Sequence, residues 1–234
     1  HLFYIVKHGI KFTGMPAWPA QTRDDEVWAV VAFLRVLPTL DESGYRELTG
    51  LNEAAPGDKL PLEDLAGESP PVPETVTENC ARCHGLDGRG QGTGAFPRLD
   101  GQRFEYLSAS LHAYAGGRRH SGIMEPLAAH LGSDDIRQIA EYYSGLPSAV
   151  HAPNAAGDPG AIERGRVLAT HGDPGRLVPA CRECHGPGVT RNPHYPRLSG
   201  QYADYIVQQL RLFRSHSRGG TEYLNFMMKV AGQL

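Results

Sequence analysis

The sequence lacks several features that would assign it to common classes of protein. Its longest strongly apolar run, residues 27–34, is too short to span a bilayer. It has no long basic run and no basic patch interleaved with aromatic residues, and its net charge is −3, so we expect no nucleic-acid partner. It begins with histidine and shows no signal-peptide pattern. We therefore expect that processing removed such a segment or that the sequence belongs to a longer chain.

Cysteine is scarce, whereas glycine and proline are abundant. The 234 residues include four cysteines, 28 glycines and 18 prolines, and 40% are hydrophobic. This apolar content is enough for a globular core, and the glycine and proline content is below that of low-complexity disorder. The length suits one or two ordinary domains or several small ones. We expect small domains with much loop.

All four cysteines fall in two copies of the pattern C-x-x-C-H, "CARCH" at 80–84 and "CRECH" at 181–185. This pattern is the attachment signature of c-type haem. Two intervening residues let both sulfurs form thioethers with the two haem vinyl groups, and the next residue then lies beneath the iron. The sequence therefore predicts two covalent haems, anchored by Cys80, Cys83, Cys181 and Cys184 and ligated by His84 and His185.

Two other interpretations of the cysteines are weaker. A C-x-x-C pair can be a redox dithiol or half of a zinc site. A four-cysteine zinc site needs the two pairs to converge, but 101 residues separate Cys80 from Cys181. A redox dithiol does not require a following histidine, and here both copies have one. Both features favour haem.

An internal repeat follows the two motifs. The segment at 97–114, "PRLDGQRFEYLSASLHAY", matches the segment at 196–213, "PRLSGQYADYIVQQLRLF". After each "GQ" the apolar spacing predicts a helix. The predicted stripes are Tyr106, Ser110, Leu111 and Tyr114 in one copy and Tyr202, Ile206, Leu210 and Phe213 in the other.

Methionines are the candidates for the sixth iron ligands, because an electron-transfer haem usually takes His and Met. Met124 lies 40 residues after the first motif histidine. The second repeat offers Met227 and Met228. Met227 precedes an alanine by four residues and a leucine by seven, as Met124 does, so this register selects Met227. The alternative for any of these methionines is filling a gap in a core.

With these motifs and the twin "PRLxGQ" segments, the sequence resembles the class I cytochromes c, and the tandem pair resembles dihaem cytochromes of the c-four type. The resemblance implies mostly α, small domains wrapped around covalent haem, which supplies core that such domains lack. The segment at 133–147 resembles the closing helix of the family. Its own pattern agrees, with Ser133 as the expected N-cap and an apolar stripe after it.

The resemblance also implies residues around each haem. In such cytochromes a proline carbonyl accepts the ring N–H of the proximal histidine, and Pro97 and Pro196 match that position. The positions that follow suggest contacts with haem propionates, or else an ordinary solvated surface. These residues are Arg98, Arg197, Gln102 and Gln201.

The chain divides into three cytochrome-like parts and two linkers. The expected units are part of a domain at 1–48, a linker at 49–73, a complete haem domain at 74–150, a linker at 151–160 and a further haem domain at 161–234. We expect a helix beginning near Thr22 as N-cap and an entry helix from Ala161. The last domain lacks a counterpart of the closing helix. We expect disorder, a covering partner chain or further sequence there.

Met15 lies in "GIKFTGMPAWPAQ", which resembles the distal loop of a third cytochrome c domain. From Met15 to Pro38 is 23 residues, as from Met124 to Pro147. The comparison implies that Met15 faces a third haem, anchored by sequence before His1, with Trp18 packed near it. The alternative is a core or surface methionine.

The predicted function is electron transfer by a multihaem c-type cytochrome, without a protein acid, base or nucleophile. Thioether attachment favours the oxidising side of a membrane, most readily the bacterial periplasm. The expected partners are redox proteins such as dehydrogenases, oxidases or other cytochromes, and the chain could be a subunit of a membrane-associated complex. The alternatives are a cytochrome subunit of a periplasmic enzyme, a catalytic haem protein of the peroxidase or thiosulfate-oxidising type, and a structural module.

Overall fold

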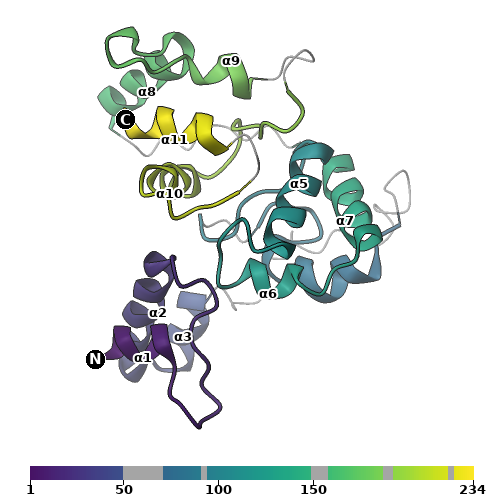
Figure 1. Cartoon of the computed structure of the whole chain (residues 1–234), viewed down its shortest axis with the longest axis vertical. Coiled ribbons are helices and arrows are strands. Elements are labelled where there is room, and N and C mark those ends of the chain that lie inside the picture. Colours follow the sequence, from purple (N-terminus) through teal and green to yellow (C-terminus); the bar gives the residue numbers. More distant parts are fainter. Residues whose placement is uncertain (50–70, 91–93, 149–157, 187–191, 221–223) are drawn as a thin grey trace.

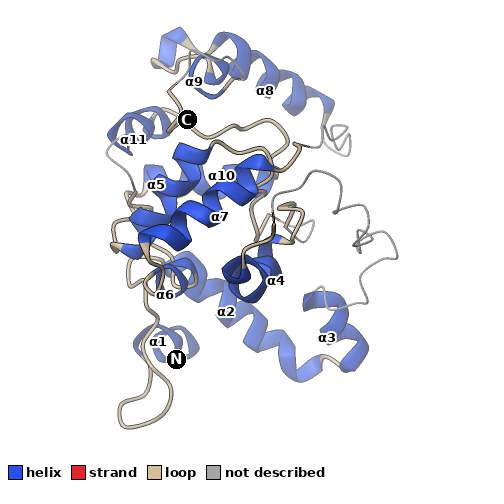
Figure 2. Cartoon of the chain, turned by 90° about the vertical axis from the view of Figure 1, so that its right-hand side faces the viewer, coloured by secondary structure: helices blue, strands red, loops and turns tan. Residues whose placement is uncertain are grey.

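The computed structural model describes residues 1–49, 71–90, 94–148, 158–186, 192–220 and 224–234. In these segments the regular structure is helical, apart from two isolated antiparallel bridges, and no β-strand is present there (Figure 2). The predicted mostly α architecture is confirmed. None of the helices in the described part of the chain combines the length and apolar character that a bilayer span requires. Most of the predicted linkers at 49–73 and 151–160 lies outside the described residues.

The first group of helices occupies one end of the molecule (Figure 1). It contains α1 (Leu2–His8), α2 (Asp24–Val36), the 3₁₀ turn η1 (Leu37–Thr39) and α3 (Glu42–Thr49). Helices α1 and α2 pack through a small core of Val6, Val27 and Val31, which are all buried. The helical pattern of α2 is thus predicted correctly, whereas the short helices α1 and α3 were not predicted from the sequence.

The expected start of α2 is wrong. The helix begins at Asp24, and the residue before it, Arg23, occupies the N-cap without a side-chain cap. Arg23 is buried, and its guanidinium pairs with Asp25 and Glu26 in the first helical turn. The acidic residues of the first turn, which are favourable to the helix dipole, are therefore paired with Arg23. The Thr22 hydroxyl does not cap the helix.

The middle domain packs its closing helix against the helix of the first repeat. Its elements are the π-helical turn η2 (Val76–Cys80), α4 (Ala81–His84), α5 (Phe104–Ala115), α6 (Met124–Ala128) and α7 (Ser133–Gly145). The predicted stripe of α7, which is Ile136, Ile139, Ala140 and Tyr143, is fully buried. Of these residues, Ile139, Ala140 and Tyr143 join Val76 and Leu107 in the core. Ser133 is the first residue of α7 rather than its cap, since Gly132 precedes the helix and donates its N–H to the Asp135 carboxylate at 2.9 Å.

The last domain repeats the order of the middle domain from the haem motif to the short helix that carries the candidate methionine. Its elements are α8 (Pro159–His171), the 3₁₀ turn η3 (Pro174–Arg176), α9 (Cys181–His185), α10 (Ala203–Arg214) and α11 (Leu224–Gly232). Helix α8 starts two residues before the predicted Ala161. Asp158 caps it by accepting the N–H groups of Gly160 and Ala161, and Pro159 occupies the first turn, where a missing N–H costs nothing.

The first helical group docks on the loop that precedes Met124. The Glu26 carboxylate accepts hydrogen bonds from Trp18 Nε1 at 2.9 Å, Gly122 N at 2.7 Å and Ser121 Oγ at 3.0 Å. Arg23 Nη1 also donates to a carbonyl of this loop, that of His120, at 2.6 Å. Gly122 has no space for a side chain, because a Cβ there would overlap the Trp18 indole. The two parts are therefore joined by one partly buried carboxylate, one arginine hydrogen bond and a close aromatic contact.

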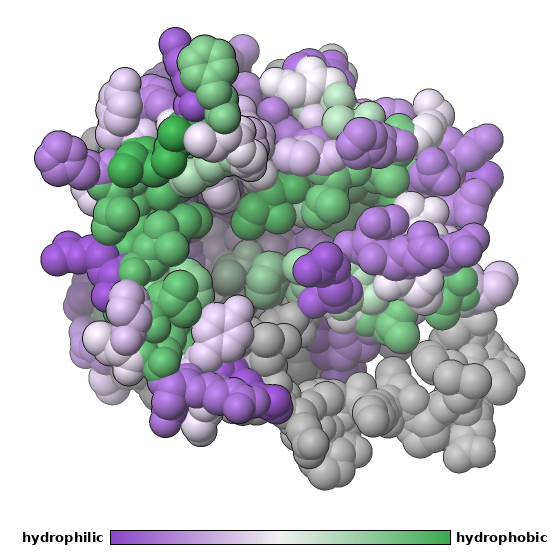
Figure 3. All heavy atoms as spheres, turned by 90° about the horizontal axis from the view of Figure 1, so that it is seen from below, coloured by the Kyte–Doolittle hydropathy of each residue, from purple (hydrophilic) through white to green (hydrophobic). Residues whose placement is uncertain are grey.

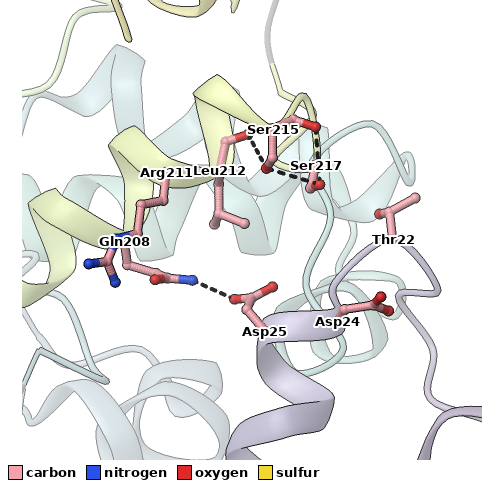
Figure 4. Close-up of a pocket in the computed structure, with 8 residues that line it drawn as sticks. All are labelled: Thr22, Asp24, Asp25, Gln208, Arg211, Leu212, Ser215 and Ser217. Atoms are coloured by element: carbon pink, nitrogen blue, oxygen red, sulfur yellow. Dashed lines mark hydrogen bonds between the residues drawn. The ribbon is translucent and has the colours of Figure 1, made fainter. Parts of the chain in front are cut away.

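A second contact joins the start of α2 to α10 beside a cleft of about 400 Å³ (Figure 4). Gln208 Nε2 donates to Asp25 Oδ2 at 2.7 Å across it. The lining residues are Thr22, Asp24, Asp25, Gln208, Arg211, Leu212, Ser215 and Ser217. None is a cysteine, histidine or methionine, so this cleft is separate from the predicted haem attachments.

Candidate functional site

Each C-x-x-C-H motif forms a short turn of helix that gathers its three functional side chains. In the first, Cys80 ends η2 and Cys83 and His84 lie in α4, while the second motif forms α9. The spacing of three residues puts both sulfurs of a pair on one side of the turn. All four thiols are free and half-buried. Burial, with a smaller contribution from Cys83, raises the pKa of Cys80 to about 11, and burial also raises that of Cys181.

Both motif histidines are oriented by a proline carbonyl. His84 Nδ1 lies 3.0 Å from the carbonyl oxygen of Pro97, and His185 Nδ1 lies 2.8 Å from that of Pro196. A carbonyl can only accept, so Nδ1 carries the proton and Nε2 keeps its lone pair. Burial lowers the pKa of both imidazoles and favours this neutral form. The residues present therefore fit a haem whose iron binds Nε2.

Two tyrosines of α7 hold the chain directly after His84. Tyr143 is buried and donates its hydroxyl to the Gly85 carbonyl at 3.1 Å, and Tyr142 donates to the Leu86 carbonyl at 2.8 Å. Burial is the main cause that raises the pKa of both phenols. The helical stripe predicted Tyr143 as core but gave no sign of these two hydrogen bonds, which tie the closing helix to the haem motif.

Replacing Tyr143 with Phe is expected to cost about 0.5–1.5 kcal/mol of stability at neutral pH, the usual net value of a buried hydrogen bond. It should also reduce the alkaline loss of stability. The pKa of Tyr143 is raised in the folded state, so its contribution is complete below about pH 10 and is lost as the pH rises through the raised value. Urea unfolding at neutral and alkaline pH measures both effects.

The matched control is Tyr4→Phe, because Tyr4 is 67% exposed. This variant should keep the alkaline loss of the parent protein. An equal alkaline loss in the parent and in Tyr143→Phe would contradict the role assigned to Tyr143.

The candidate distal methionines lie at matching places in the two domains. Met124 is the first residue of α6, and Met227 and Met228 lie in α11; all three are half-buried. Ala128 and Ala231, four residues after Met124 and Met227, are both buried. This shared burial agrees with the register that selects Met227 over Met228. The ligand roles themselves remain predictions.

The two "GQ" glutamines join the domains reciprocally. Gln201 accepts from the backbone N–H of Arg98 at 3.0 Å and donates to the Arg98 carbonyl at 3.0 Å. Gln102 accepts from the N–H of Arg197 at 3.0 Å and donates to the Arg197 carbonyl at 2.7 Å. Each side-chain amide thus pairs with the other domain as a peptide group in a strand would. The repeat is therefore also an interface.

The two arginines of the "PRLxGQ" segments also have protein partners. Arg98 is buried and forms an ion pair with Asp100, and Arg197 Nη1 donates to the Gly101 carbonyl at 2.8 Å. The contacts of these residues with haem propionates remain a prediction. The alternative of a solvated surface is wrong for Arg98 and for Gln102, which are 4% and 7% exposed.

A second pair of arginines, not singled out from the sequence, is buried between the domains. Arg119 donates to the Tyr205 hydroxyl at 3.0 Å and to Gln209 Oε1 at 3.3 Å, and Arg218 donates to the same Gln209 oxygen at 2.7 Å. Each guanidinium also lies over an aromatic ring of its own domain. Within the described residues neither forms an ion pair with a carboxylate. Their positions, 99 residues apart like the two "GQ" segments, are the signal that could have found them.

The environment of Met15 is apolar. Met15 and Trp18 are half-buried against the core of Val6, Val27 and Val31. The Trp18 indole N–H is bound to Glu26. The structure thus brings the two predicted residues of the "GIKFTGMPAWPAQ" loop into one cluster, and their role toward a third haem remains a prediction.

Comparisons with known proteins agree with this arrangement. The family model described as cytochrome c matches residues 73–146. The chain is 38% identical over 155 residues to a thiosulfate dehydrogenase electron acceptor of Thiomonas intermedia, covering 65% of this chain and 70% of that protein. It is 32% identical over 157 residues to cytochrome c4 of Pseudomonas aeruginosa, covering 66% and 76%. The crystal structure of reduced recombinant cytochrome c4 from Pseudomonas stutzeri superposes with a TM-score of 0.57 at 31% identity, covering 66% of this chain and 85% of that one.

Proposed function

The chain belongs to the multihaem class I cytochromes c, and on this premise we propose that it is a periplasmic carrier that passes single electrons between two His/Met-ligated haems and redox partners. The chain binds haem c covalently, and its cysteine pairs fit two attachment motifs. When bound, haem supplies reversible one-electron chemistry. The observation that carries the proposal is the joining of two such motifs, each with an oriented histidine, by reciprocal glutamine contacts.

The protein residues have distinct roles in this proposal. The cysteines would anchor each haem, and His84 and His185 would hold its iron. Pro97 and Pro196 fix the orientation of those rings, which strengthens the histidines as ligands. Met124 and Met227 would supply the second protein ligand to each iron, and a thioether in that role raises the reduction potential. The apolar core of the middle domain would exclude water from its haem.

We further propose that the partners include a dehydrogenase that delivers electrons to the chain. Support comes from a relative whose name, thiosulfate dehydrogenase electron acceptor, describes that relation for its own protein. Placement in the periplasm is supported by the haem attachment chemistry. Association with a membrane would be through such partners or through parts outside the sequence.

A third haem is proposed at Met15. The four cysteines are all used by two haems, so its anchors would come from outside this sequence. Apolar side chains support the proposal, because they gather around a hollow on the face seen in Figure 3. The large apolar side chains exposed in the first helical group are Leu2, Tyr4, Ile10, Phe12, Trp28, Val36, Leu37, Tyr45 and Leu48. An exposed apolar surface of this kind is suited to packing against the rest of a small haem domain.

The ligand assignment is tested with single methionine variants of the whole chain. Met124→Ala and Met227→Ala are each expected to remove about half of the near-infrared Met–iron charge-transfer band that arises from these two haems, because each methionine serves one of two haems. Met228→Ala is the matched control and should keep the band. A band that is unchanged by Met227→Ala and halved by Met228→Ala would overturn the register. A parent protein without the band, with rapid cyanide binding, would overturn the electron-carrier proposal in favour of a catalytic haem.

A further inference from the structure

One arginine of the middle domain reaches the haem motif of the last domain. Arg103 directly follows Gln102 and precedes α5. Its Nη2 donates to the carbonyl oxygen of Gly186 at 3.3 Å, and Gly186 directly follows His185. Its Nε is buried without a hydrogen-bond partner. No ion pair of Arg103 is present within the described residues, so its charge is not neutralised there by a carboxylate.

The positive charge of Arg103 lies beside the iron-binding turn of the other domain. Its guanidinium is hydrogen-bonded to Gly186, the residue directly after His185. In the first motif the corresponding carbonyl, that of Gly85, accepts instead from the neutral hydroxyl of Tyr143 at 3.1 Å. The two turns therefore differ in the charge of the side chain bound to them.

The repeat places a neutral residue at the equivalent position. Counting from the two "PRLxGQ" segments, Tyr202 corresponds to Arg103. Its hydroxyl donates to the Arg89 carbonyl at 2.7 Å, so it also reaches the other domain after the haem motif. Near the first motif, Asp87 accepts the Arg89 N–H at 3.0 Å, and its carboxylate also lies 3.7 Å from Arg89 Nε, so its charge is paired. The two haem environments thus differ in charge where the sequence is otherwise repeated.

We propose that Arg103 sets the order in which the two haems are reduced, by raising the reduction potential of the haem attached through Cys181 and Cys184. Reduction adds one electron to the iron and lowers the local positive charge by one. A fixed cation nearby stabilises the reduced state relative to the oxidised one, and partial burial keeps solvent from screening it. At the first haem the equivalent position is the neutral Tyr202, and the nearby Asp87 is paired with Arg89. An electron entering through the middle domain therefore moves toward the last domain.

The test is a spectroelectrochemical titration of the intact dihaem protein and its Arg103→Gln variant. The two haems are distinguished by NMR, using contacts of the second haem with Tyr195, whose ring lies 6.0 Å from the His185 ring. Arg103→Gln is expected to shift the electron distribution in the half-reduced protein toward the first haem by about tenfold, which equals about 59 mV for a one-electron couple. Arg103→Lys keeps the charge and should retain most of the parent distribution.

A gain-of-charge variant provides the mirror test. Tyr202→Arg is expected to raise the potential of the first haem and to narrow the gap between the two. An unchanged distribution in Arg103→Gln, or equal losses in Arg103→Gln and Arg103→Lys, would overturn the proposal, because the second result indicates lost packing and not lost charge. The haem content and the Met–iron band of each variant show separately whether attachment and ligation are intact, so a failure of the proposed function is distinguishable from a failure of this inference.

Discussion

A chain in which Cys80 and Cys83 are both replaced by alanine is expected to mature with one covalent haem in place of two and to lose the folded middle domain. The core of that domain consists of seven buried side chains, one from η2, one from α5 and the rest from α7 and its end. So small a core buries too little apolar surface to be stable alone, and haem completes it. Mass spectrometry and haem absorbance per chain measure the first effect, and loss of the cooperative unfolding of this domain measures the second.

The matched variant replaces Cys181 and Cys184 with alanine. It should also carry one haem, but it should keep the middle domain folded, since that domain has its own haem and its own closing helix α7. Two covalent haems in either double variant would contradict the attachment proposed here. A middle domain that unfolds cooperatively without its haem would contradict the role of haem as missing core.

Replacing Gln102 and Gln201 together with alanine is expected to separate the two haem domains. The pair makes four hydrogen bonds to backbone groups across the interface, of 2.7–3.0 Å. At about 0.5–1.5 kcal/mol for each bond, their loss weakens docking by roughly 2–6 kcal/mol. Small-angle scattering should show a larger radius of gyration, and electron transfer between the haems should slow, because the haems are no longer held at a fixed separation.

The single variant Gln102→Ala is the control for additivity. It leaves both bonds of Gln201 with Arg98, so its loss of docking should be about half that of the double variant. Haem content should be unchanged in both variants. An unaltered scattering profile and transfer rate in the double variant would show that other contacts, such as those of Arg119 and Arg218, suffice to hold the domains together.

Local patterns in the sequence predicted much of the fold. Helices α2, α5, α7 and α10 follow from apolar residues repeated at helical spacing, and the haem motifs are defined by five adjacent residues. The starts of the helices were less certain, because caps depend on tertiary contacts. Arg23 illustrates this, since its ion pairs and its bond to the His120 carbonyl fix the start of α2.

Contacts between domains could not be predicted in the same way. A repeat shows that Gln102 and Gln201 are equivalent, but equivalence does not show that the two residues face each other's backbone. Tyr202 was predicted only as part of a helical stripe, and it precedes α10 as the N-cap residue. Its contact with the other domain and that of Arg103 were not predicted, because the two equivalent residues differ between the copies. The contact of Glu26 with Gly122 joins residues that are 96 positions apart, and no local pattern indicates such a pairing.

The central claim is that residues 74–234 carry two covalent haems that each exchange one electron. Coulometric titration of the intact protein, followed by visible and near-infrared absorption, tests this directly. We predict that the haems anchored by Cys80, Cys83, Cys181 and Cys184 take up two electrons in two one-electron steps, with a Met–iron band at both ferric haems. A ferric haem among these two that lacks the band, binds cyanide rapidly and turns over peroxide or thiosulfate would contradict it.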